Sequence, residues 1–128
     1  MPTINVLLFV ESRYQVSRKR IKDTVSTFLD EQGMSKPVEI SVAIVGDRKM
    51  RQLNKKYRGL DKTTNVLSFS LTEGDSTKLP IDVLHLGDVV LSYPQVIKDA
   101  ARDEVMVDDK VDELIKHGLM HLLGLHHE

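Results

Sequence analysis

The stretch that most constrains the fold is Val38–Val45, in which branched aliphatic side chains alternate with smaller or more polar ones. The aliphatic positions share one face: Val38, Ile40, Val42 and Ile44. A period of two is typical of a β-strand with one buried face and one less apolar face. Because the buried face must be covered by another layer of structure, we expect the rest of the chain to supply that cover.

The flanking segments carry extended and helical patterns in turn. Short apolar or alternating runs predict strands at these ranges: 4–10, 38–45, 65–71 and 87–91. Helical spacing of apolar residues predicts helices at these ranges: 17–32, 47–57, 94–103 and 108–123. A polar stretch with Gly and Pro, 73–80, is expected to be a loop. The order βαβαββαα predicts an α+β fold with one four-stranded mixed sheet and helices on one or both faces. It does not give the order of the strands.

The residues around these helices suit helix ends. Ser17 and Asp47 can cap the first and second helices, since their side-chain oxygens can accept hydrogen bonds from free backbone N–H groups. Three glycines follow helices and can adopt the left-handed conformation that ends them: Gly33, Gly59 and Gly124.

Length and composition are those of one globular domain, residues 1–128, with 41% hydrophobic and 29% charged residues. There are no cysteines, so disulfides and thiolate metal sites are excluded, and His and carboxylates must hold any transition metal. The apolar run near the start is too short for a signal peptide or a membrane span. We therefore expect a cytoplasmic protein that makes no membrane contact.

The net charge of −1 hides two local runs of opposite sign. Residues 48–62 hold one acid, Asp61, and seven bases, for a local charge of +6. These bases are candidate RNA-binding residues: Arg48, Lys49, Arg51, Lys55, Lys56, Arg58 and Lys62. Residues 99–113 hold seven acids and two bases. The alternative is that both runs are solvated helix faces.

Four of the five histidines lie in the last twelve residues. His117 and His121 are four apart on a predicted helix, so they share one face. A chain reversal at Gly124 can bring His126 or His127 back toward them, and the spacing H-x3-H-x2-G-x2-H favours His127. Three imidazoles with one open position are typical of a catalytic zinc ion, although nickel, copper or cobalt can occupy such a site in vitro. Without the third histidine, the pair could equally be buried core residues.

The residue after the first histidine separates two kinds of zinc hydrolase. A zinc protease with this spacing has Glu there as its general base, and this chain has Gly118, which cannot move a proton. Glu128 is a weak substitute because it ends the chain. A metal can still lower the pKa of bound water to about 7 and polarise the scissile group. The pattern therefore favours phosphodiester over peptide hydrolysis.

Three blocks of the chain resemble the YbeY-type metal-dependent endoribonucleases of ribosomal RNA maturation. The closing signature H-G-x-L-H-L-x-G-Y-D-H aligns with residues 117–127, with all three histidine ligands and both glycines matching. The motif L-N-x-x-Y-R-x-x-D-x-x-T-D-V-L-S-F aligns with 53–69, and L-G-D-I-x-I-S with 86–92. Apart from exchanges of one aliphatic or Met residue for another, the departures are Asn65 and His126 in place of Asp and Leu125 in place of Tyr.

The resemblance implies a catalytic site made of Arg58, His117 and His121, with one zinc ion held by His117, His121 and His127. It also implies cleavage of RNA with a preference for single strands. The expected partners are 16S ribosomal RNA and the small ribosomal subunit, in rRNA maturation and ribosome quality control. Two alternatives stay open, a zinc peptidase or amidase, and an RNA- or ribosome-binding module in which zinc is only structural.

Overall fold

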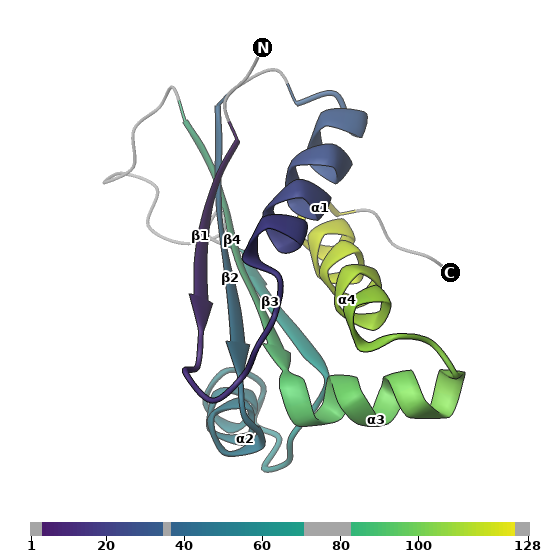
Figure 1. Cartoon of the computed structure of the whole chain (residues 1–128). Helices are drawn as coiled ribbons and strands as arrows, with labels where there is room; N and C mark the ends of the chain where they lie inside the picture. The colour runs from purple at the N-terminus through teal and green to yellow at the C-terminus, as the bar shows by residue number, and fades with distance from the viewer. Residues whose placement is uncertain (1–3, 35–36, 71–82, 125–128) are drawn as a thin grey trace.

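The computed structural model describes residues 4–34, 37–70 and 83–124, and it contains four strands and four helices in the predicted order (Figure 1). The strands are β1 (Ile4–Val10), β2 (Val38–Val45), β3 (Val66–Ser70) and β4 (Leu84–Ser92). The helices are α1 (Arg18–Glu31), α2 (Asp47–Arg58), α3 (Tyr93–Asp103) and α4 (Val107–Leu122). The predicted loop at 73–80 lies outside the described residues.

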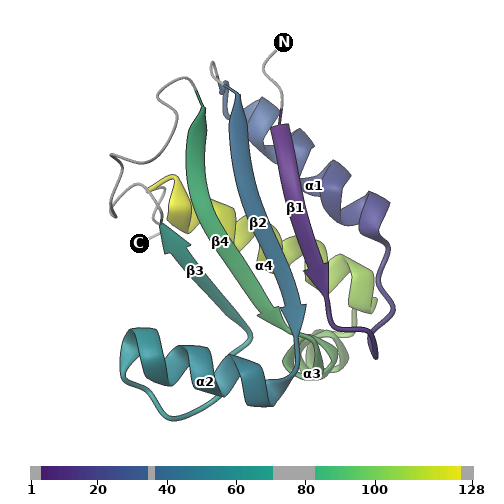
Figure 2. The same ribbon diagram turned by 90° about the vertical axis from the view of Figure 1, so that its left-hand side faces the viewer.

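The four strands form one mixed sheet in the order β1-β2-β4-β3. β1, β2 and β4 are parallel, whereas β3 lies at the edge and runs antiparallel to β4 (Figure 2). Val42 of β2 has Leu8 of β1 and Val89 of β4 as its register partners. The predicted fold class is therefore confirmed, and the structure adds the strand order.

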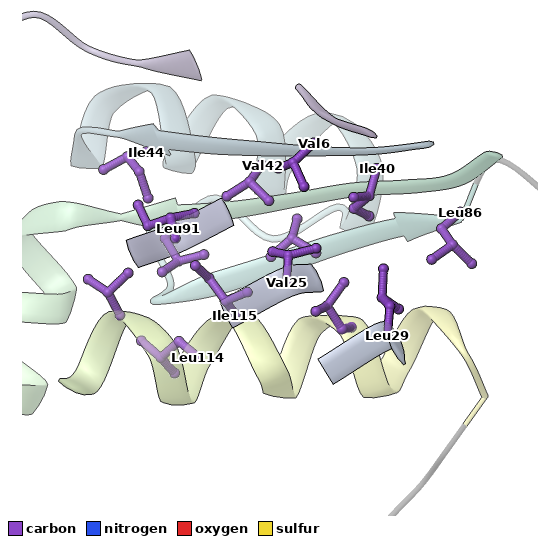
Figure 3. Packing of buried hydrophobic residues seen from close by; sticks show 14 of the residues in the cluster. Val6, Val25, Leu29, Ile40, Val42, Ile44, Leu86, Leu91, Leu114 and Ile115 are labelled. Atoms are coloured by element: carbon purple, nitrogen blue, oxygen red, sulfur yellow. The ribbon is translucent and has the colours of Figure 1, made fainter. Parts of the chain in front are cut away.

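The main hydrophobic core lies between the sheet and the two helices α1 and α4, which cover the same face (Figures 1 and 3). All four aliphatic positions predicted for the buried face of β2 are at most 1% exposed. They pack with Val25 and Leu29 of α1 and with Ile115 and Leu119 of α4. We call this covered side the inner face of the sheet.

On the opposite side, the outer face, α2 is the one helix of the described residues that covers the sheet, and it does so at one end (Figure 2). A second and smaller cluster of buried residues lies there: Val45, Met50, Leu67 and Val90. Away from α2, the side chains of Leu7 and Phe9 on β1 are 47% and 59% exposed. The two faces of the sheet are thus unequally covered.

Most predicted helix ends are confirmed, and one is wrong. Ser17 Oγ accepts a hydrogen bond from Arg20 N at 3.2 Å, and Gly59 and Gly124 have φ of +69° and +74°. The prediction that Asp47 caps α2 is wrong, because Gly46 occupies the cap position and Asp47 is the first helical residue. Its carboxylate is instead engaged by side chains from elsewhere in the fold, as described below.

β4 is longer than predicted, extending from Leu84 to Ser92 rather than from 87 to 91. The pairing with β2 shifts register between Glu39 and Ile40, and Gly87 has φ of +137°. This irregularity interrupts the alternating pattern from which the strand was predicted. No helix in the described part of the chain is long and apolar enough to cross a membrane.

Candidate active site

The two histidines of the predicted metal site lie on the exposed edge of α4. Both His117 and His121 are exposed, whereas Gly118 and Leu119 between them are buried against the sheet. The imidazole ring centroids are 5.7 Å apart with 57° between the ring planes. The alternative that these histidines are core residues is therefore wrong, and the pair can contribute nitrogen ligands to a common ion.

The predicted third ligand, His127, lies outside the described residues, as do His126 and Glu128. Within 4–34, 37–70 and 83–124, no group of three His, Asp or Glu side chains is placed to hold a metal. The described part of the site thus supplies two neighbouring imidazoles from one helix turn. Two exposed imidazoles fit the nitrogen-rich donor set that zinc takes in catalytic sites.

Gly118 has a packing role that the sequence did not reveal. A Cβ atom built at this position would lie 2.8 Å from Val89 Cγ1 and 3.1 Å from Val89 Cγ2. Val89 is fully buried in β4, so it has little room to move. The glycine therefore lets α4 approach the sheet closely. A Glu in its place, as in zinc proteases, would require α4 or β4 to shift.

Arg58 lies beside the histidine pair although it is about sixty residues away in the sequence. It is the last residue of α2, and Gly59 turns the chain back immediately after it. A hollow of about 520 Å³ is lined by Arg58, His117 and His121. Tyr57 and residues 64–69 complete its lining. We call it the histidine–arginine hollow. It brings together two of the three predicted metal ligands and the predicted catalytic arginine.

The turn that follows Arg58 is held from inside α2 by Asn54. This side chain is 2% exposed, and its Nδ2 donates a hydrogen bond to the Lys62 backbone oxygen at 2.8 Å. The backbone oxygen of Asn54 accepts from Leu60 N at 3.3 Å. One residue thus fixes both the end of the helix and the path of the next few residues, and with them the direction of the Arg58 backbone.

The other end of α2 is fixed by Asp47. Its Oδ1 accepts hydrogen bonds from Ser92 Oγ at 2.7 Å, Thr63 Oγ1 at 2.9 Å and Gln95 Nε2 at 3.1 Å. Partial burial opposes ionisation, but these donors, with a smaller contribution from the charge of Lys98, outweigh it and lower the pKa of Asp47. The carboxylate joins α2, the end of β4, α3 and the segment before β3.

The basic run is exposed, but only one of its members lines the histidine–arginine hollow. Arg48, Lys49, Arg51, Lys55 and Lys56 are exposed on α2, and Lys62 is exposed in the following turn. Arg51 forms an ion pair with Asp61, with 2.8 Å between Nε and Oδ1. Of the seven predicted RNA-binding residues, Arg58 alone lines the hollow with the histidines. The other six are exposed on α2 or in the turn that follows it.

The acidic run holds helices together. Arg20 Nη2 of α1 contacts Asp109 and Asp112 of α4 at 2.6 and 2.9 Å. Lys110 is buried and bonds to Asp103 of α3. Hydrogen bonds from Arg102 and Lys110 lower the pKa of Asp103 to about 2. The run is therefore largely accounted for by contacts among α1, α3 and α4.

Asn65 and His85 each have a structural partner. Asn65 Nδ2 donates to Asp99 Oδ2 at 2.9 Å, a contact that an Asp at position 65 could make only if one carboxylate were protonated. His85 lies in β4 with its Nδ1 3.2 Å from Glu39 Oε1 and is mostly buried. The departure from the family pattern at Asn65 therefore has a local explanation.

Comparison with known proteins identifies relatives of this chain. The sequence model of endoribonuclease YbeY matches residues 9–128, almost the whole chain. The chain belongs to the endoribonuclease YbeY family. A relative named endoribonuclease YbeY, from Dehalococcoides mccartyi, is 37% identical over 135 aligned positions, which cover 98% of this chain and 78% of that protein. One from Syntrophus aciditrophicus is 44% identical over 90 residues, covering 70% of this chain and 55% of that relative.

The prediction of an endoribonuclease, and thus of a hydrolase and nuclease, is confirmed by membership of this YbeY family. A solution structure of a Thermotoga maritima protein shares the fold, with a TM-score of 0.63 and 21% identity. That match covers 96% of this chain and 75% of the other.

Two residues that shape the YbeY site were missed as functional residues by the sequence reasoning. Asp47 was assigned only as a helix cap, and Asn54 was given no role. A signal for Asn54 was present, because Met50 and Asn54 are four apart and therefore share the face of α2 that packs on the sheet. An amide at such a position requires a hydrogen-bond partner.

Proposed function

We propose that this YbeY-family protein is a zinc-dependent endoribonuclease that cleaves single-stranded segments of RNA at the histidine–arginine hollow. The observation that carries the proposal is the meeting of Arg58 with His117 and His121 in one hollow. Cations and imidazoles are the groups that a phosphodiester substrate and a catalytic metal require. Zinc is favoured because the chain has no cysteine and offers imidazole nitrogens.

The residues have separate tasks in this mechanism. His117 and His121 hold the ion, with His127 as the proposed third ligand. A metal ion held by these residues would supply positive charge beside the scissile phosphate and would make water more acidic. The Arg58 guanidinium binds the non-bridging phosphate oxygens in a bidentate manner. Asn54 and Asp47 keep α2 in place, so that Arg58 needs little rearrangement to reach the phosphate.

Gly118 argues against the peptidase alternative. The position of a protease base is occupied by a glycine that packs on Val89, so no carboxylate can project there without moving the helix. The exposed cations around Arg58 support a polyanionic substrate. We propose that this substrate is ribosomal RNA, 16S rRNA in the small subunit, and that the protein works in the cytoplasm, where ribosomes mature.

The test pairs metal content with cleavage of a single-stranded RNA. Wild type, His121→Ala and Arg58→Ala are compared, with Lys22→Ala as a control because Lys22 is an exposed cation on α1 away from the hollow. We expect one zinc ion per wild-type chain, and loss of both zinc and cleavage in His121→Ala. Arg58→Ala should keep zinc and cleave at least about a hundredfold more slowly. Lys22→Ala should behave as wild type.

Two results would redirect the proposal. If wild type holds zinc, binds RNA and cleaves none, the metal is structural and the protein is an RNA-binding module. If Arg58→Ala keeps the wild-type rate, the arginine has no part in catalysis. Product ends report the nucleophile, because a 2′,3′-cyclic phosphate indicates attack by the 2′-hydroxyl of the RNA rather than by water.

A further inference from the structure

A second hollow lies on the outer face of the sheet, beside the histidine–arginine hollow. Its volume is about 560 Å³. It lies between α2 and the middle of the sheet, and it is lined by the following residues: Ser41, Ala43, Leu53, Tyr57, Ser68, Phe69, Ser70, Asp88, Val89 and Val90. We call it the outer hollow. Tyr57, Ser68 and Phe69 line both hollows, so the two adjoin.

An aromatic pair forms one wall of the outer hollow. The ring centroids of Tyr57 and Phe69 are 4.7 Å apart, with 49° between the rings. Tyr57 is nevertheless 55% exposed, and Lys56 Nζ lies 5.2 Å from its ring centroid. An exposed aromatic ring with a cation beside it is the arrangement on which proteins stack the bases of single-stranded RNA.

The floor of the outer hollow carries a carboxylate. Asp88 lies in the middle of β4 and is flanked across the strands by Ser41 and Phe69. It is only partly exposed, and no hydrogen-bond or ion-pair partner is found for it among the residues that the structure describes. An ionised carboxylate can only accept hydrogen bonds. It therefore repels a phosphate but can receive N–H groups of a nucleobase.

We propose that the outer hollow binds one unpaired nucleobase of the RNA substrate, next to the phosphate held at Arg58. The base stacks on Tyr57, and its N–H groups donate to Asp88. Guanine fits best, because it presents two adjacent N–H donors on its pairing edge to the two oxygens of the carboxylate. Uracil presents one N–H donor between two carbonyl acceptors, which the carboxylate repels.

The surroundings favour RNA over a protein as the occupant. The outer hollow is bordered by α2, whose exposed cations complement a polyanion. It also adjoins the hollow in which the RNA phosphate is proposed to bind, so consecutive parts of one strand can occupy both. This inference rests on the proposed function, since it extends the same RNA path across the edge strand β3.

The test measures binding by the full-length zinc protein, independently of cleavage. Labelled eight-nucleotide RNAs are used, all uridine or with a single guanosine moved stepwise along the strand. Fluorescence anisotropy gives Kd, and a gel run afterwards shows that the RNA is intact. The variants are Tyr57→Ala, Tyr57→Phe and Asp88→Asn. Phe9→Ala is the matched control, because Phe9 is an exposed aromatic on the same sheet face that does not line the outer hollow.

We expect wild type to prefer guanosine at one position of the strand. Tyr57→Ala should weaken binding of that RNA about tenfold, whereas Tyr57→Phe and Phe9→Ala should stay within about twofold of wild type. Asp88→Asn should remove the preference for guanosine and leave the affinity for the all-uridine RNA unchanged. Thermal melting of each variant reports whether it has folded.

Three other outcomes would contradict the base site in the outer hollow, the proposed function, or both. If wild type binds and cleaves RNA but Tyr57→Ala and Asp88→Asn match Phe9→Ala, the outer hollow is not a base site, and the proposed function stands. If wild type neither binds nor cleaves any RNA, the proposed function fails, and this inference fails with it. If the variants keep RNA binding but no longer bind a ribosomal protein that wild type binds, the outer hollow is a protein-docking surface.

Discussion

The two helices that build the candidate site are held in place in different ways. α4 buries Val111, Leu114, Ile115, Gly118 and Leu119 against the inner face, and its histidines lie at the exposed edge of that contact. α2 buries only Met50 and Asn54, and its ends are fixed by polar contacts of Asp47 and Asn54. The metal side of the site therefore depends on core packing, and the phosphate side depends on a few hydrogen bonds.

This difference has a consequence for how the site responds to mutation. Apolar packing is spread over many contacts, so the position of α4 is coupled to global stability. The position of α2 is decided by single polar groups, and losing one removes a specific constraint. Substitutions of the polar groups that position α2 should therefore displace Arg58 and slow RNA cleavage, without unfolding α4 or releasing the metal.

The largest effect is expected for Asp47→Ala. The hydroxyl of Ser92, which is 0% exposed, would lose its acceptor, and Thr63 and Gln95 would lose theirs as well. We expect a loss of about 2 kcal/mol in the free energy of unfolding. Chemical denaturation measures this loss, and zinc content should be retained. Asp61→Ala, which removes an exposed carboxylate, is the control. If Asp47→Ala lost its zinc to the same extent as its RNA cleavage, the metal side on α4 would not be independent of the phosphate side on α2.

The same residue gives a pH dependence. The pKa of Asp47 is lowered in the folded protein from its usual 3.8, so its contribution to stability is present above about pH 4. It is lost as the pH falls from there through the folded pKa, because the carboxylate must then be protonated. Stability curves of wild type and Asp47→Ala should converge in this acid range. A constant difference down to the lowest pH would contradict the assignment.

A smaller effect is expected on the α4 side from Gly118→Ala. Overpacking typically costs about 1–3 kcal/mol, whereas Ala gains about 1 kcal/mol over Gly inside a helix. The added Cβ meets Val89, so a net loss of about 1 kcal/mol is expected. In a Val89→Ala background the contact is absent, and Gly118→Ala should stabilise the protein. A double-mutant cycle measured by denaturation tests this, and additive effects would show that the close approach is unimportant.

The smallest effect is expected from the surface of α2. Arg51 and Asp61 form an exposed ion pair, which is screened by water and salt. Arg51→Ala should leave the melting temperature unchanged within error. If it weakens RNA binding, the effect should shrink as salt is raised, because a phosphate contact is lost. A clear drop in melting temperature would show that this exposed ion pair also holds α2 in place. The position of α2 would then not depend on Asp47 and Asn54 alone.

Several features of the site could be predicted because they follow from local pattern. The spacing of His117 and His121 placed them on one helix face, and the absence of a protease base was read from Gly118 alone. The helices and strands followed from periodicity, since a buried face repeats every two or 3.6 residues. The role assigned to Asp47 was wrong because Asp is equally suited to a helix cap and to a tertiary hydrogen bond.

The sequence by itself determined the elements, the mixed α+β class, the histidine pair and the basic run, because each depends on residues close together in the chain. The resemblance implied that Arg58 and the histidines share a site, but the tertiary structure alone decided the hollow in which they lie and the order of the strands. It also decided the close contact of Gly118 with Val89 and the outer hollow of Tyr57, Phe69 and Asp88. Those features join segments tens of residues apart. Their geometry is fixed by how α2 and α4 pack on opposite faces of the same sheet, and no local pattern encodes that arrangement.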